Sequence, residues 1–252
     1  MFRLFICLFA ANFCKHRDLI YYGGKTLQNV KIITVWWGQS VRYKKELETF
    51  YSTIVKSHWF RSLNEYNIVS GSWERSLNYN GTNETIINDT IIKDQLVKLI
   101  KQYSISSDQN YYFAIHLSTG VSIVSPSLSC VDFYAYHSNI DNIFYGVMPE
   151  CINKGRKLNS FDSITHASSH ELSEAITDPI PYTGWITQEK SEIADICNTY
   201  ILTWNGYKLN SLYSNRLKRC ISDPEIYSFI YIAFYLFITV FIIIGTLHSK
   251  YF

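Results

Sequence analysis

Runs of consecutive apolar residues alternate along the chain with stretches in which apolar residues recur every three or four positions. Short apolar runs rich in Val, Ile and aromatic residues are typical of buried strands. They occupy residues 30–37, 111–117 and 143–148. A further strand is expected at residues 130–137, and residues 59–73 are expected to be irregular or strand-like.

The helical spacing occurs over residues 41–57, 89–103 and 162–177. In the first of these helices it gathers on one face Leu47, Phe50, Tyr51 and Ile54. Asp162 is expected to cap the third helix. That helix should end before Asp178, because the residue before Pro179 avoids helical backbone angles. Strands that alternate with helices predict an α/β domain, with a mixed sheet and helices packed against it.

The C-terminal region contains no charged residue between positions 226 and 247. A bilayer core requires about 20 apolar residues in a helix, so this stretch predicts one transmembrane helix, followed by a short cytosolic tail at residues 248–252. A buried core helix and a lipid-anchor signal are the alternatives. The lipid-anchor signal ranks below the span, because cleavage before its polar spacer would remove Cys220. The membrane is therefore an expected partner.

Residues 1–14 combine a basic start with a short apolar run, which predicts a secretory signal peptide. A buried first strand is the alternative. The basic residues Arg216, Lys218 and Arg219 precede the expected span and favour the opposite orientation by the positive-inside rule. The signal peptide decides the assignment, and residues 15–225 are expected to form one extracellular domain.

Composition agrees with a secreted domain. The net charge is only +2, from 23 Lys and Arg against 21 Asp and Glu, which argues against a nucleic-acid partner. Three Asn-x-Thr acceptors predict N-glycosylation at Asn80, Asn83 and Asn88. Outside the signal segment, an even number of cysteines indicates disulfides, with four buried thiols as the alternative. Pairing between sequence neighbours is the simplest arrangement, and it joins Cys130 to Cys151 and Cys197 to Cys220.

The third predicted helix carries the candidate chemistry. His170 and Glu174 are four residues apart and therefore share one face, whereas Glu171 lies about 100° round the helix. A histidine and a carboxylate can both bind zinc, and the spacing is that of zinc peptidases in which the Glu after the first His is the general base. We therefore expect zinc at His170 and Glu174, with Glu171 as the catalytic base. An ordinary polar helix face is the alternative.

A zinc site needs a third protein ligand. The candidates are Glu192, Asp195 and His137, and spacing alone does not choose among them. His166 lies one turn before His170 and could replace a ligand or support one. Phosphate loops, dinucleotide fingerprints and serine nucleophile elbows are absent from the sequence.

Several segments resemble the secreted phosphate-induced protein 1 (EXORDIUM-like) family and its bacterial and fungal relatives. The similarity is carried, in this order along the chain, by residues 21–24, 30–38, 129–138, 143–151, 168–179, 192–197 and 213–215 with Cys220. The resemblance implies a zincin-like α/β fold and an extracellular or cell-wall location. Carried over by position, His170, Glu171, Glu174 and either Glu192 or Asp195 match its polar motifs, and His137 matches a Tyr-His pair. The chain differs by its expected C-terminal span and by lacking a glycine-rich stretch at residues 198–210.

Two functions follow from these observations. The first is a membrane-tethered extracellular hydrolase that uses zinc and acts on peptides. The second is a non-catalytic surface or cell-wall protein that keeps the fold and binds a cell-wall ligand. The replacement of a histidine by Glu174 favours the second, because an added carboxylate weakens the power of the ion to acidify water.

Overall fold

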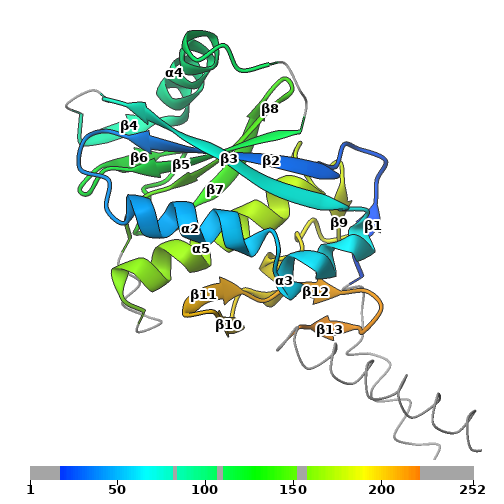
Figure 1. Ribbon diagram of the computed structural model, residues 1–252. Coiled ribbons are helices and arrows are strands. Elements are labelled where there is room, and N and C mark those ends of the chain that lie inside the picture. The colour runs from blue at the N-terminus through cyan, green and yellow to red at the C-terminus, as the bar shows by residue number, and fades with distance from the viewer. Residues whose placement is uncertain (1–17, 82–83, 107–109, 152–157, 222–252) are drawn as a thin grey trace, which may run out of the picture.

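The computed structural model describes residues 18–81, 84–106, 110–151 and 158–221 (Figure 1). Its centre is a five-stranded mixed sheet with the spatial order β3-β2-β5-β8-β7. The first four strands run parallel, and β7 pairs antiparallel with β8 at one edge. The strands are β3 (Ser70–Tyr79), β2 (Asn29–Trp37), β5 (Tyr111–Leu117), β8 (Ile143–Met148) and β7 (Tyr136–Ile140).

Four helices accompany the sheet, namely α2 (Lys44–Ile54), α3 (His58–Arg61), α4 (Asp89–Gln102) and α5 (Ser160–Thr177). Two 3₁₀ turns add to them, η1 (Ser62–Tyr66) and η3 (Asp195–Cys197). Short strands form two-stranded pairs, namely β1 (Ile20–Tyr21) with β9 (Trp185–Ile186), β4 (Ile86–Asn88) with β6 (Ser122–Val124), β10 (Ile201–Trp204) with β11 (Tyr207–Asn210), and β12 (Tyr213–Ser214) with β13 (Arg219–Cys220). The mixed sheet with packed helices is the α/β arrangement that the sequence pattern predicts.

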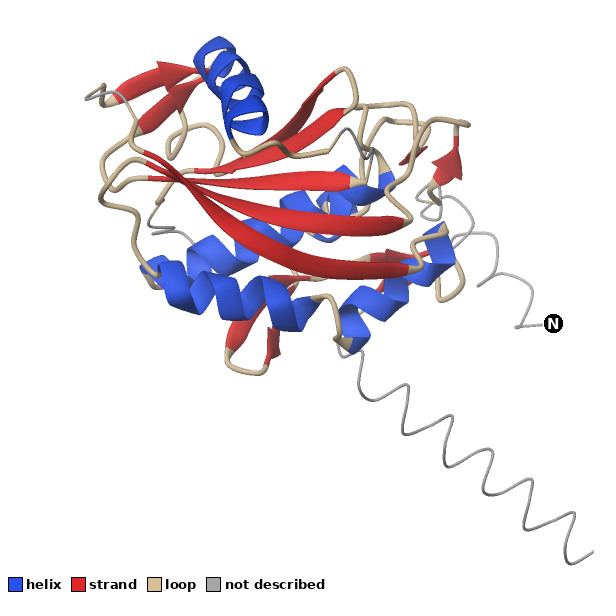
Figure 2. Cartoon of the chain, turned by 45° about the horizontal axis from the view of Figure 1, so that its top comes forward, coloured by secondary structure: helices blue, strands red, loops and turns tan. Residues whose placement is uncertain are grey.

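Helices lie on both faces of the sheet, which makes three layers (Figures 1 and 2), and the central strands β2, β5 and β8 are largely buried. Side chains alternate along β2, so that Ile32 belongs to the core beneath α2 and α5, and Ile33 to the core beneath α4. A strand covered on both sides must be apolar throughout, and this explains the uninterrupted apolar runs in the sequence. The predicted apolar face of α2 is confirmed, since its buried residues are Leu47, Phe50, Tyr51 and Ile54.

Helix α5 differs from the other helices because most of its polar side chains are buried. It packs against β8, β7 and β5 on one side and against β11 on the other. Its N-cap is Asn159, whose side-chain oxygen accepts a hydrogen bond from the backbone N–H of Asp162. The predicted cap at Asp162 is therefore wrong, because the helix starts earlier, at Ser160. Its end at Thr177 is confirmed.

Both predicted disulfides are confirmed. Cys130 pairs with Cys151, and this bond links the segment before β7 to the segment after β8. Cys197 pairs with Cys220, which ties η3 to β13. The cysteines in each pair are 21 and 23 residues apart, and closing loops of this size stabilises a domain by about 3 kcal/mol each in the chain-entropy model.

The expected fold also included a C-terminal transmembrane helix, and the structure does not support it. Among the described residues, none of the helices has both the length and the apolar character that crossing a bilayer needs. Even α5, with 18 residues, carries buried Glu and His side chains that a hydrocarbon environment would penalise. That expectation rested on hydropathy alone, and residues 226–247 lie outside the described part of the chain, as do residues 1–14 and 248–252.

Other element predictions need smaller corrections. The strand expected at residues 130–137 forms later, as β7 (Tyr136–Ile140), because Cys130 has a positive φ of 65° in a turn. Residues 59–73, expected to be irregular or strand-like, contain α3 and η1, and they are in a strand only where β3 begins, at Ser70. Of the expected glycosylation acceptors, Asn80 and Asn88 are exposed, and Asn83 lies outside the described residues.

Candidate metal centre

His170 and Glu174 face the same way from α5, as their spacing predicts. Nε2 of His170 lies 3.1 Å from Oε2 of Glu174, and the two side chains are only 13% and 4% exposed. Two ligand atoms that each sit about 2.0–2.2 Å from a tetrahedral zinc ion are roughly 3.3–3.6 Å apart. The two side chains are therefore close to the separation at which both could hold one ion.

Asp195 completes this group. Its Oδ1 lies 3.5 Å from Nε2 of His170, and its backbone N–H donates to Oε1 of Glu174 at 3.1 Å. The backbone bond leaves Oε2 of Glu174 directed at His170, and the three ligand atoms all lie within 4.8 Å of one another. Asp195 opens η3, which the Cys197 disulfide holds in place. Between Glu192 and Asp195, the structure thus brings Asp195 to His170.

Asn210 orients the imidazole of His170, and it does so from β11. Its amide nitrogen donates to the carbonyls of Ala194 and Ser211 at 3.0 and 2.7 Å. These bonds fix the amide orientation and direct Oδ1 at Nδ1 of His170, at 3.4 Å. Nδ1 must therefore carry a proton, and Nε2 faces the two carboxylates as the coordinating nitrogen. Metal-binding histidines are usually oriented in this way by an acceptor at the other ring nitrogen.

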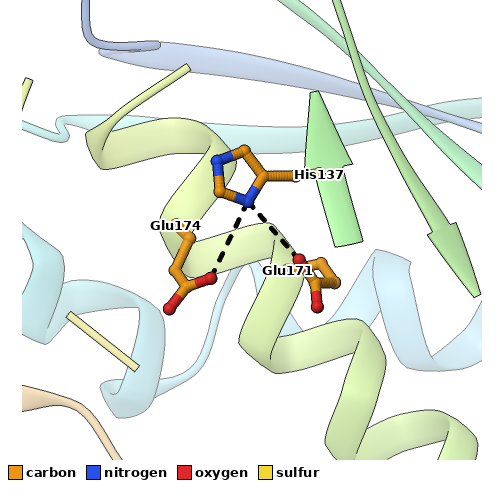
Figure 3. A group of neighbouring side chains, drawn as sticks. All are labelled: His137, Glu171 and Glu174. Carbon is orange, nitrogen blue, oxygen red and sulfur yellow. Dashed lines mark ion pairs between the residues drawn. The ribbon is translucent and has the colours of Figure 1, made fainter. Parts of the chain in front are cut away.

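His137 reaches the same cluster from the edge strand β7 (Figure 3). Its Nδ1 lies 3.4 Å from Oε2 of Glu171 and 3.7 Å from Oε2 of Glu174. On the other side of the ring, Nε2 lies 3.3 Å from Oε1 of Glu192. The structure therefore brings all the predicted ligand candidates together, with Glu174 placed between the two imidazoles.

The charges in this cluster are strongly coupled. Burial by itself lowers the pKa of His170, but the neighbouring Glu174 carboxylate outweighs it and raises this pKa to about 10. Burial also lowers the pKa of His137, and the carboxylates of Glu192, Glu171 and Glu174 raise it well above its ordinary value. Burial raises the pKa of Glu174. In the absence of a cation, protons on both imidazoles offset the carboxylate charge, and a bound cation would replace them.

A cavity of about 350 Å³ opens onto the cluster. His170, Glu171 and Asp195 line it, and so does the predicted supporting residue His166. Much of the remaining wall comes from residues 132–135, directly before β7. The volume lies in the range of small-molecule and side-chain sites, so a substrate could reach Glu171 and His170 together.

Sequence reasoning did not find Asn210, and it placed Asp178 at the end of the helix without assigning its side chain a role. Asp178 accepts hydrogen bonds from the backbone N–H groups of Tyr182, Thr183 and Gly184 at 2.6–2.9 Å, and thereby shapes the turn after α5. An Asp before proline is a turn signal that the sequence does display. Asn210 carries no such signal, because it is an isolated residue at the end of a short strand.

Comparisons with known proteins add no assignment. No protein-family model matches the chain, and neither a curated protein nor a solved structure matches it. The resemblance to the EXORDIUM-like family therefore stays a prediction.

Proposed function

We propose that the protein is a zinc-dependent hydrolase that acts on peptides. The observation that carries the proposal is the group formed by His170, Glu174 and Asp195, which we name the first cation position. Its ligand atoms are spaced for one ion, its histidine is oriented by Asn210, and it opens onto a cavity. One nitrogen and two carboxylate oxygens suit zinc and leave a fourth position for water or substrate.

Glu171 is the group that would transfer the proton. It follows His170 on α5, lies in the wall of the cavity, and is 5% exposed. A bound zinc ion would supply Lewis acidity at the reacting carbonyl and lower the pKa of the attacking water. Glu171 would take the proton of that water and pass it to the leaving amine. His137, 3.4 Å from Oε2 of Glu171, holds the carboxylate in place.

A peptide substrate is favoured by the position of β7. This strand pairs with β8 on one side, and within the described residues no strand covers its other side. An extended peptide can hydrogen-bond to such an edge. Because β7 carries His137 and follows the cavity wall, a peptide bound there would run past Glu171.

The second function is a non-catalytic metal-binding protein of an oxidising compartment. The specific observation in its favour is the ligand set, since Glu174 and Asp195 are both carboxylates. Two carboxylates reduce the net charge of the ion and with it the acidity of a bound water. The two disulfides favour an oxidising compartment for either function.

One set of variants distinguishes the two functions. The full chain, made in a secretory host, is compared with His170→Ala and Glu171→Gln by elemental analysis and by hydrolysis of a fluorogenic peptide library. We expect His170→Ala to lose zinc from the first cation position, and Glu171→Gln to keep it while kcat falls about 10²–10⁴-fold. The exposed Glu189→Gln is the matched control and should retain both zinc and activity.

Two outcomes would contradict the proposal. Wild-type protein that stays metal-free after zinc is added back would exclude the metal centre. Zinc-loaded wild type without peptidase activity, or a Glu171→Gln variant as active as wild type, would leave the non-catalytic protein as the better account.

A further inference from the structure

The cluster holds a second group of ligand atoms beside the first cation position. Nδ1 of His137, a carboxylate oxygen of Glu171 and a carboxylate oxygen of Glu174 also lie within 4.8 Å of one another (Figure 3). The individual distances from Nδ1 are 3.4 Å to Glu171 and 3.7 Å to Glu174. The first distance lies within the roughly 3.3–3.6 Å expected between two ligands of a tetrahedral ion, and the second is slightly longer. Glu174 belongs to both groups.

His137 and Glu192 supply an independent observation. Nε2 of His137 and Oε1 of Glu192 lie 3.3 Å apart, yet neither atom has a hydrogen-bond partner in the described structure. The His137 side chain is 5% exposed, so water does not readily replace the missing partner. If Nδ1 binds a cation, the proton of the neutral ring must sit on Nε2, and Glu192 is placed to accept it. A small rotation would then satisfy both unpartnered atoms and produce a carboxylate–histidine–metal arrangement.

The excess of carboxylates over imidazoles in the cluster also favours a second cation. The cluster contains four carboxylates against two imidazoles, namely Glu171, Glu174, Glu192 and Asp195 against His137 and His170. Buried charge is costly unless it is compensated. The Asp195 side chain is 46% exposed, so solvent offsets part of its charge, and the buried carboxylates are those of Glu171, Glu174 and Glu192. With neutral imidazoles, one divalent ion leaves one of these three buried charges uncompensated, and a second divalent ion compensates it.

We infer that the protein has a second cation position, formed by His137, Glu171 and Glu174, which takes a divalent transition-metal ion such as zinc or manganese and inhibits hydrolysis. The inference rests on the proposed hydrolase in one respect, because it assigns Glu171 to proton transfer. Binding of Glu171 to the second ion occupies the carboxylate lone pairs that would accept the proton of water. The ligand set of one imidazole and two carboxylates suits both metals.

The second position binds more weakly than the first. Glu174 belongs to both positions, so the first ion already neutralises part of its negative charge and the second ion is attracted less strongly. Zinc should therefore activate the enzyme at one equivalent and inhibit it as a second equivalent binds. Glu192 acts as a positioning residue, since it orients His137 and does not contact the ion.

The test is a calorimetric zinc titration of the full chain, oxidised and freed of metal with a chelator. Wild type should bind two equivalents with different affinities. His137→Asn should bind one equivalent, and inhibition of hydrolysis should require more zinc in Glu192→Gln than in wild type. Glu192→Gln should keep the first equivalent and weaken the second about 10–100-fold. Glu189→Gln, at an exposed site, should behave as wild type.

Circular dichroism verifies the fold of each variant, and Glu192→Gln replaces His137→Asn if the latter does not fold. A single equivalent in wild type would overturn the second position. Two equivalents with unchanged affinities in both variants would do the same. A third outcome separates the two proposals. If wild type binds two zinc equivalents and Glu192→Gln binds the second more weakly, but no peptide is hydrolysed, the second position is supported and the proposed hydrolase is refuted.

Discussion

The helices α4 and α5, which lie against opposite faces of the central sheet, have opposite character. On one face, α4 buries the apolar side chains of Ile92, Leu96 and Leu99. On the other, α5 buries Glu171 and Glu174 together with several serines and threonines. Buried polar groups cost free energy unless they are paired, so α5 depends on its polar partners, whereas α4 is held by apolar packing. The proposed metal site therefore lies on one face of the sheet.

The contrast predicts that the α4 face can be weakened without affecting the metal centre. Leu96 is fully buried between α4 and the sheet, and Leu96→Ala should lower the free energy of unfolding by about 2–5 kcal/mol. Zinc stoichiometry should not change, because Leu96 belongs to the core on the face of the sheet opposite α5. Urea denaturation and elemental analysis measure the two properties. A folded Leu96→Ala protein that binds no zinc would contradict the separation of the two faces.

A second prediction concerns His116, which lies on β5 beneath α5. Burial lowers the pKa of His116 from its ordinary 6.5 to about 3. Below pH 6.5 the His116 imidazole is protonated in the unfolded chain, whereas in the folded chain it stays neutral down to about pH 3. Stability is therefore complete above pH 6.5 and falls between pH 6.5 and pH 3, by a few kcal/mol at most, at about 1.4 kcal/mol per pKa unit.

His116→Gln isolates this contribution. Nε2 of His116 lies 3.1 Å from the Tyr51 hydroxyl, and a glutamine oxygen can accept the same hydrogen bond without titrating. The unfolding free energy of metal-free wild type and variant is compared at pH 7 and pH 4.5. The wild type should lose more stability on acidification, and an equal loss in both proteins would refute the prediction.

The third prediction tests the orientation of His170. Asn210→Leu removes the oxygen that faces Nδ1 at 3.4 Å and should weaken zinc binding about 10–100-fold. Asn210→Asp is the matched variant, because it keeps an acceptor oxygen at that place and should lose less affinity. Competition with a chromophoric chelator gives both values. Equal affinities for the two variants would show that Asn210 has only a packing role.

The smallest predicted effect lies on the α4 side. The Asn88 side chain caps α4 by accepting a hydrogen bond from the backbone N–H of Ile91 at 3.0 Å. Asn88→Ala should lower stability by about 1 kcal/mol. Asn80→Ala, at an exposed acceptor that caps no helix, should change it by less than about 0.5 kcal/mol. Thermal unfolding of protein made without glycans measures both, and equal shifts would speak against the cap.

The parts of this fold that the sequence predicts are those set by local spacing. The strands β5 and β8 coincide with their apolar runs, and His170 and Glu174 share a face because four residues make about one helical turn. The choice between Glu192 and Asp195 depends on where η3 packs, which spacing does not encode. The N-cap is Asn159 and not Asp162. Asn and Asp are both good N-cap residues, and these two lie within about one turn of each other, so the sequence does not decide between them.

The burial of α5 also has a consequence for the order of folding. The partners of its polar side chains come from far along the chain, since Ser169 and His170 meet Asn210 across 41 and 40 residues. A serine-rich helix gains little from burial until those partners are in place, and contacts of such separation form late in folding. During synthesis, α5 must therefore wait for the β10–β11 hairpin before its final environment exists. If the proposed metal site is correct, only a chain that has completed this last docking step would bind the ion.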